Sequence, residues 1–192
     1  MSKKSNRTND FSAGQILARL ERLARLTRSA SHVEGLNAAQ WEALRYISRA
    51  NSFSNSPGAL ARYLGATKGT TSQTVLSLIK KNVIAKSTRG DDGRSVVLVL
   101  TQDGHKILGR DPLLNLEQAI ANLGDKTLKR FSKGLSELLE IEVASQEEPS
   151  FGTCAQCAFA SPDQAGTFCK MLKVNVGAED VQKLCFHYKA VR

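Results

Sequence analysis

The segment between residues 56 and 100 constrains the fold more strongly than any other part of the chain. Ser56 followed by Pro57 is typical of a helix start, because serine caps the first backbone N–H groups and proline suits the first helical position. The short helix that follows is expected to end near Gly65, which suits a left-handed C-terminal cap. Thr67 then caps a second and longer helix, KGTTSQTVLSLIKKN. A short helix and a longer one joined by a tight turn form a helix-turn-helix.

The second of these helices has an apolar face and a polar face. Val75, Leu78 and Ile79 recur at helical spacing and are expected to point into a core. The outward face is expected to carry hydrogen-bonding side chains, namely Lys68, Thr70, Thr71, Gln73, Thr74 and Ser77. Such side chains suit base edges and phosphates, and the second helix of a helix-turn-helix enters the major groove of DNA. These six residues are therefore candidate DNA contacts.

A β-hairpin is predicted directly after this helix. Residues 84–89 and 95–100 are strand-like, and GDDG at residues 90–93 supplies the turn. A basic hairpin tip at this place reaches a minor groove or the adjacent phosphates. Two arginines that flank the turn therefore join the candidate DNA contacts: Arg89 and Arg94. The predicted fold class is mainly α with a β-hairpin wing, a winged helix-turn-helix.

Amphipathic helices are predicted before this unit. After a disordered basic tail at residues 1–10, residues 11–30 place apolar side chains along one helical face. Asn37 precedes AAQWEALRYI, where Gln40 completes a capping box and Trp41 belongs to the core. Two further helices are therefore expected before the helix-turn-helix.

Two more helices are predicted after the hairpin, at residues 102–122 and 125–145. Pro112 is expected to kink or restart the first of them, because proline disrupts a helix interior. We therefore assign residues 11–145 to one domain, whose leucine-rich last helices could pack either within the chain or against a second copy.

The charge of the chain is concentrated in its first half. Residues 1–94 carry 16 lysines and arginines against 6 aspartates and glutamates, whereas residues 146–192 carry five of each. A basic front half suggests a polyanion such as nucleic acid as the partner. The sequence contains no apolar run of membrane-spanning length and no apolar segment typical of a signal peptide, so we expect a cytoplasmic protein that does not enter a membrane.

The ordered motifs resemble the MarR-type winged-helix transcription regulators. The resemblance rests on LNAAQWEALRYI, LARYLGATKGTTSQTVLSLIKKNVI and DDGRSVVLVLTQDG. Gly93 stands where that family often has a second arginine, and Asn82 stands where it often has glycine, although Asn tolerates a left-handed conformation. The resemblance implies a homodimer whose first and last long helices interlock and which binds a roughly palindromic operator in double-stranded DNA. It also implies that Asp92 and Arg94 belong to the DNA contacts, because they match the Asp-x-Arg pattern of that family's wing.

All four cysteines of the chain lie after a linker at residues 146–150, in a small module at residues 151–192. Cys154, Cys157, Cys169 and Cys185 form a C-x2-C-x11-C-x15-C arrangement. In a reducing compartment such a cluster favours metal ligation, and we favour an Fe–S cluster over structural zinc, with a disulfide or a thioredoxin-like redox pair as further alternatives. His187 is a candidate replacement for one thiolate, although a solvated bystander is the more frequent role of such a histidine.

The sequence therefore predicts a dimeric DNA-binding transcription regulator whose operator affinity is tuned by a four-cysteine metal centre that senses redox state, oxygen, nitric oxide or iron. The alternative is an Fe–S or C-x2-C redox protein that uses a winged-helix scaffold for protein contacts. We find no nucleophile motif, phosphate loop or paired carboxylates and do not expect an enzyme. Because some forty residues bury too little apolar surface, we expect the module to need its metal in order to fold and to act through the linker that follows the last long helix.

Overall fold

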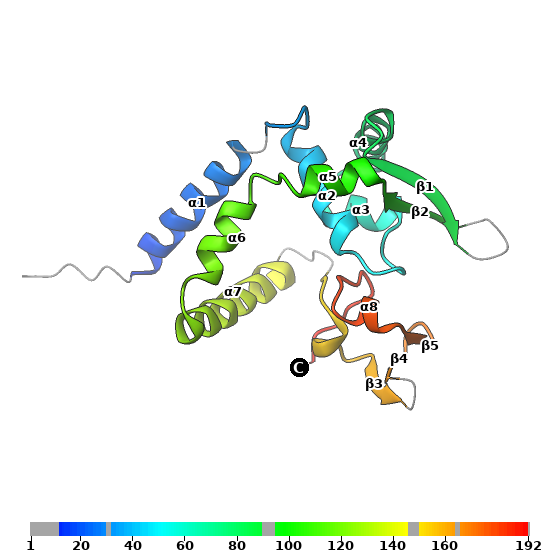
Figure 1. Ribbon diagram of the computed structural model, residues 1–192. Helices are drawn as coiled ribbons and strands as arrows, with labels where there is room; N and C mark the ends of the chain where they lie inside the picture. Colours follow the sequence, from blue (N-terminus) through cyan, green and yellow to red (C-terminus); the bar gives the residue numbers. More distant parts are fainter. Residues whose placement is uncertain (1–11, 30–31, 90–94, 146–149, 164–165, 192) are drawn as a thin grey trace, which may run out of the picture.

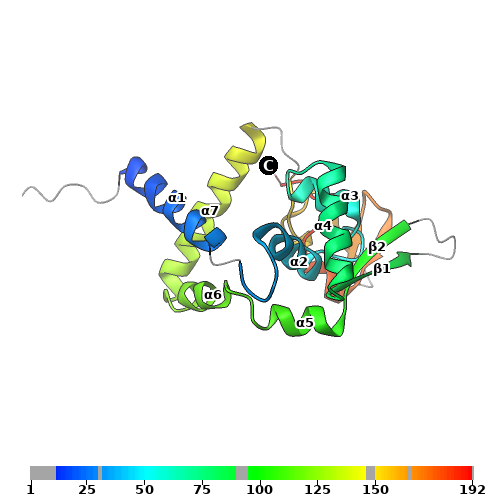
Figure 2. The same cartoon turned by 90° about the horizontal axis from the view of Figure 1, so that it is seen from above.

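The computed structural model describes residues 12–29, 32–89, 95–145, 150–163 and 166–191. Figure 1 shows three parts. A winged helix occupies the centre, the helices α1, α6 and α7 stand to one side of it, and a small C-terminal module lies below it. Figure 2, turned by 90°, shows the same separation of α1, α6 and α7 from the winged helix.

The winged helix is built on α2 (Ala38–Arg49), α3 (Pro57–Tyr63) and α4 (Lys68–Lys80), with α5 (Gln102–Leu108) packed beside them. Its core is predominantly apolar, and its largest fully buried apolar and aromatic side chains are Trp41, Leu44, Tyr46, Leu60, Leu78, Val83, Ile84 and Leu98. The expected core position of Trp41 is confirmed. Burial of these side chains away from water is the main stabilising term of this part.

The predicted helix ends are confirmed by their hydrogen bonds. The side chain of Asn37 accepts from the backbone N–H of Gln40, and the Gln40 side chain accepts from the N–H of Asn37, which completes the capping box. Ser56 caps α3 with proline at the first helical position, and Thr67 caps α4. Gly65 has φ +57°, the left-handed conformation expected for a C-terminal cap.

The wing consists of β1 (Ile84–Arg89) and β2 (Ser95–Leu100), paired antiparallel with Ile84 opposite Leu100. The turn between them, with Asp92 and Arg94, lies outside the described residues. Asn82, just before β1, has φ +58°, as its tolerance of that conformation allows. A Cβ at Gly104 in α5 would lie 2.0 Å from the carbonyl oxygen of Val83, so only glycine allows α5 to pack against the start of the wing.

The segment predicted as one helix at 102–122 is two helices, since α5 ends at Leu108 and α6 (Leu114–Ala121) begins after a break. Pro112 lies in that break, which confirms a restart rather than a kink. α1 (Ala13–Ser29), α6 and α7 (Asp125–Ser145) contain no buried residue. Their apolar stripes are exposed in the single chain. No described helix is long and apolar enough to cross a membrane.

The C-terminal module contains η1 (Cys154–Gln156), β3 (Ala160–Asp163), β4 (Gly166–Cys169), β5 (Val174–Val176) and α8 (Ala178–Val181). The strands form one antiparallel sheet in the order β3-β4-β5. Its buried residues are Cys169, Val176, Asp180 and Cys185. Two of these four are cysteines, so the module has almost no apolar core of its own.

Candidate nucleic-acid interface and cysteine module

The outward face of α4 is polar, as predicted, and is unobstructed in the chain. Lys68, Thr70 and Gln73 are exposed. The Thr67 and Thr70 hydroxyl groups lie 2.9 Å apart at the helix start, where the N-terminal end of the helix dipole favours a phosphate. α4 lies at the top of the winged helix in Figure 1, on the side opposite the cysteine module. This face is therefore accessible to a partner molecule such as a DNA duplex.

Two of the predicted contacts on α4, Thr71 and Ser77, are engaged within the domain, whereas Thr74 is half-exposed and stays a predicted DNA contact. Thr71 is only 2% exposed and packs inward with Val75 and Leu78, so its assignment as a DNA contact is wrong. Its Oγ1 is buried and has no hydrogen-bond partner among the described residues. The Ser77 hydroxyl accepts a 2.8 Å hydrogen bond from Nε2 of Gln40, and Thr74 Oγ1 donates to the Thr70 carbonyl. Ser77 thus ties α4 to α2.

Two exposed residues of α4 were missed by the sequence reasoning. Ser72 is exposed, and Leu76 is 41% exposed, next to Gln73 on the outer surface. The signal that identifies them is the spacing of the inward stripe at residues 71, 75 and 78, which leaves residues 73 and 76 on the opposite side and residue 72 beside them. Thr71 was counted as a polar surface residue, and for that reason its place in the inward stripe was missed.

The wing residue Arg89 is held against the body of the domain rather than pointing freely outward. Its guanidinium donates a 3.0 Å hydrogen bond to Oδ1 of Asn55 and lies 5.5 Å from the centre of the Phe53 ring. The backbone N–H of Leu98 in β2 donates to the Asn55 carbonyl at 2.7 Å. The loop between α2 and α3 therefore supports both strands of the wing.

The four cysteines are free thiols on separate segments of the module. Cys154 begins η1 and Cys157 follows it, and the N–H of Cys157 donates to the Cys154 carbonyl. Cys169 ends β4, and Cys185 forms an antiparallel bridge with Gly152. Burial raises the pKa of the Cys154 thiol, and the charges of the other three cysteines raise it further, so the four thiols share one neighbourhood. Within the described part of the chain, however, no three His, Cys, Asp or Glu side chains are arranged to hold a metal ion.

His187 packs its ring against Phe186 with the ring centres 4.9 Å apart. Burial lowers the pKa of His187, which favours the neutral imidazole. These features describe a packed rather than a solvated histidine, and its replacement of one thiolate stays an untested alternative.

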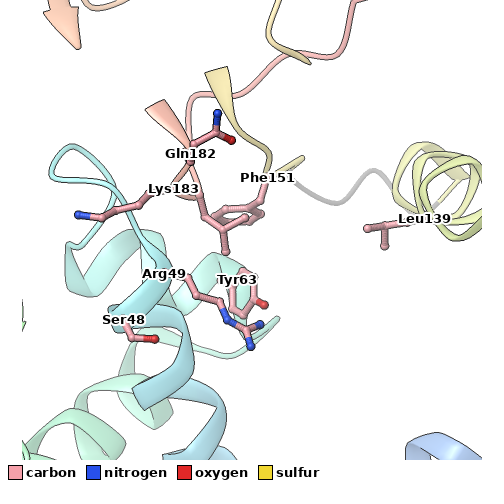
Figure 3. A pocket seen from close by; sticks show the side chains of 8 residues that line it. Ser48, Arg49, Tyr63, Leu139, Phe151, Gln182 and Lys183 are labelled. Carbon is pink, nitrogen blue, oxygen red and sulfur yellow. The ribbon is translucent and has the colours of Figure 1, made fainter. Parts of the chain in front are cut away.

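The module docks directly on the winged helix. Phe151 lies edge-on to Tyr46 and Tyr63, at ring-centre distances of 6.0 and 5.2 Å, and Phe186 lies beneath the Arg62 guanidinium at 5.0 Å. A pocket of about 530 Å³ opens beside this contact, lined by Ser48, Arg49, Tyr63, Leu139, Phe151, Gln182, Lys183 and Leu184. Figure 3 shows Leu139 of α7 across the opening from Phe151, so the pocket marks where α2, α3, α7 and the module meet.

Comparison with known proteins identifies the central part of the chain. Residues 34–95 match the model of the MarR family. A MarR family transcriptional regulator from Silicibacter pomeroyi has 25% sequence identity and a TM-score of 0.56, with 74% of this chain and 97% of that chain covered. No curated protein matches the chain significantly.

Two solved DNA complexes have the same fold. The S. aureus MepR–DNA complex has 17% identity, a TM-score of 0.53 and coverage of 69% of this chain and 98% of that chain. Streptococcus pneumoniae FabT in complex with DNA has 19% identity, a TM-score of 0.53 and coverage of 68% and 96%. The matched family segment contains α2, α3, α4 and β1, whereas the cysteine module lies outside it. This chain therefore carries a winged helix of the MarR fold whose helix-turn-helix segment matches the MarR family, extended by a four-cysteine module.

Proposed function

We propose that the protein is a homodimeric DNA-binding transcription regulator whose operator affinity is tuned by a metal centre in its C-terminal module. The observation that carries the DNA-binding part is the exposed face of α4, with Lys68, Ser72, Gln73 and Leu76, in a domain of the MarR fold. A lysine supplies a phosphate contact, Ser72 and Gln73 supply hydrogen bonds to base edges, and Leu76 supplies an apolar contact for a thymine methyl group.

Dimerisation is supported by the apolar surface of α1, α6 and α7. Leu17 is 58% exposed in α1, and Leu139 and Ile141 are each 63% exposed in α7. Phe131, Leu135 and Leu138 add a stripe at spacings of four and three residues along α7. Contiguous apolar faces of this kind mark interaction surfaces, and a second copy of the chain offers the same faces in self-complementary form. The dimer would present two α4 helices to successive major grooves of a palindromic site.

The metal centre is supported by the composition of the module's interior. Four thiols lie in one neighbourhood, two of them are buried, and Val176 is the only other apolar side chain of the module in the buried set of the described residues. So small a core does not stabilise an independent fold, and a bound metal supplies folding free energy directly. Thiolate ligands suit both zinc and iron–sulfur clusters, and binding requires the thiols to approach one another more closely than in this structure.

The test starts from protein purified without oxygen. Its metal and sulfide contents and its absorption spectrum are measured, and its affinity is determined for a duplex selected from random sequence. Cys157→Ser is then compared with the wild type, and Ser161→Ala, a change in the same module that leaves all four thiols in place, serves as the control. Loss of metal with a changed DNA affinity in Cys157→Ser alone is the expected result. Failure of all proteins to select any duplex would refute the DNA-binding part of the proposal, and stoichiometric metal in Cys157→Ser would exclude that cysteine as an essential ligand.

A further inference from the structure

The segment around Cys185 makes the principal backbone contacts between the module and the winged helix. Leu184 forms a parallel bridge with Ala50, in which its N–H donates to the Arg49 carbonyl at 2.8 Å and its carbonyl accepts from Asn51 at 2.9 Å. The N–H of Phe186 donates to Oγ of Ser54 at 2.8 Å. Cys185 therefore stands between two residues that are both anchored on the loop between α2 and α3.

The loop that receives these contacts, residues 50–55, is itself held by buried groups. Asn51 is 1% exposed and Ser54 is 0% exposed. The Tyr46 hydroxyl donates to the Ser54 carbonyl at 2.6 Å, and the Asp180 carboxylate of the module accepts from the Ser52 N–H at 3.1 Å. A loop fixed from both sides in this way transmits a displacement, because buried hydrogen-bonding groups cannot separate without a large cost.

The same loop ends at the base of the wing. Asn55 accepts from the Leu98 N–H of β2 through its carbonyl and from Arg89 of β1 through its side chain. Ser56, the next residue, caps the first helix of the helix-turn-helix. Asn51 and Ser54, which bind the residues on either side of Cys185, are therefore only a few residues from the groups that position the wing and α3.

On the other side, Cys185 is tied to the remaining module. Its N–H donates to the Gly152 carbonyl at 2.8 Å, and the N–H of Ala158, next to Cys157, donates to the Lys189 carbonyl at 2.8 Å. A Cβ at Gly152 would lie 2.6 Å from the Tyr188 ring, which shows how closely the two segments approach. Drawing the four sulfurs onto one metal would therefore fix residues 184–189 as a unit.

We infer that metal binding at the four cysteines changes DNA affinity through residues 184–186 and the loop at residues 50–55. Together these two segments hold the wing in its DNA-binding position. This inference rests on the proposed function and specifies its regulation. Metal loss loosens residues 184–186, releases Asn55 from a defined position and weakens DNA binding. The route runs through the docked face of the module, whereas the sequence pattern pointed to the linker after α7.

The decisive variant is Phe186→Ala, which removes a docking side chain and leaves every cysteine in place. The matched control is Phe168→Ala, because Phe168 is also half-buried and adjacent to a cysteine, but lies in β4. Each protein is measured with Zn²⁺ bound and after chelation, for affinity to the selected duplex and for hydrogen exchange at the amides of Asn51 and Leu98.

For the wild type and Phe168→Ala we expect chelation to lower DNA affinity by about 5- to 150-fold and to speed exchange at both amides. Phe186→Ala should retain Zn²⁺, bind DNA weakly and respond little to chelation. A full metal response in Phe186→Ala would overturn the inference while leaving the proposed function intact. DNA affinity independent of metal in the wild type would overturn the inference together with the metal-tuning part of the proposed function, and would leave its DNA-binding part intact. Wild-type protein that binds DNA but no metal would overturn both the metal centre and this inference, whereas absence of DNA binding in every form would refute the proposed function itself.

Discussion

The guanidinium of Arg45 in α2 forms a bidentate ion pair with the carboxylate of Asp111, with Nε 2.6 Å from Oδ2 and Nη2 2.7 Å from Oδ1. Both side chains are largely buried, at 13% and 10% exposure. Asp111 lies in the break between α5 and α6, and its Oδ1 also accepts from the N–H of Leu113. This pair therefore holds the connection between α5 and α6 against α2.

Replacing Asp111 by alanine leaves the largely buried Arg45 guanidinium without its partner. We expect the free energy of unfolding to fall by about 2 kcal/mol, since charge-assisted hydrogen bonds at a poorly solvated site are among the stronger ones. Urea denaturation followed by circular dichroism measures the change. The control is Glu137→Ala, because the exposed Lys133–Glu137 pair at 3.7 Å should contribute almost nothing. Equal effects of the two variants would contradict the structural role of Arg45 and Asp111.

The same pair predicts a pH dependence. Burial alone would raise the pKa of Asp111, but hydrogen bonds from Arg45 and from the Leu113 N–H outweigh it and hold the pKa below its ordinary value of 3.8. A lowered folded-state pKa stabilises the fold above the unfolded-state value, and this contribution is lost as the pH falls below 3.8 towards the folded-state value. The stability difference between wild type and Asp111→Asn should therefore be constant near neutral pH and shrink in acid. A difference that grows in acid would contradict the lowered pKa.

Thr71→Val should make the protein more stable. The change keeps the shape of the side chain and removes a buried hydroxyl that has no hydrogen-bond partner among the described residues, so we expect a gain of about 1 kcal/mol in the free energy of unfolding. Thermal and urea denaturation measure it. DNA sequence preference should remain that of the wild type, and a changed preference would restore Thr71 to the DNA contacts.

Substitutions on the exposed face of α4 should separate phosphate contacts from base contacts. Lys68→Ala should weaken binding to all sequences and reduce the slope of log K against log salt by about one unit. Gln73→Ala should instead relax discrimination at one base pair by about 1–3 kcal/mol, with little change in salt slope. Binding to a panel of single-base variants at several salt concentrations distinguishes the two. Identical signatures would mean that α4 does not lie in the major groove as proposed.

Leu138→Glu places a charge in the exposed apolar stripe of α7. Because Leu138 is 47% exposed in the single chain, the winged helix should remain folded while the proposed dimer dissociates. Sedimentation velocity measures the oligomeric state, and near-ultraviolet circular dichroism around the buried Trp41 monitors the fold. Met171→Glu is the matched control, since Met171 is 51% exposed but lies in the cysteine module. A Leu138→Glu protein that stays dimeric would exclude α7 from the interface.

The sequence by itself determined the elements of the winged helix, because their signals are local. The caps at Asn37, Ser56 and Thr67 act on N–H groups three residues away, so short-range chemistry fixes those helix starts. The sequence also predicted the strand limits of the wing and a disruption of the helix at Pro112, as either a kink or a restart. The four-cysteine spacing marked the module as separate from the domain before it.

Only the tertiary structure decided which polar residues are buried and where the module docks. Thr71 was read as a surface residue because its hydroxyl outweighs its methyl group in a polarity pattern, yet packing against α2 and α3 turns it inward. The hydrogen bond from Phe186 to Ser54 joins residues 132 positions apart, and nothing in either local sequence specifies the other. Contacts of that kind depend on complementary surfaces of the winged helix and the module. These surfaces form only when each part of the chain has folded.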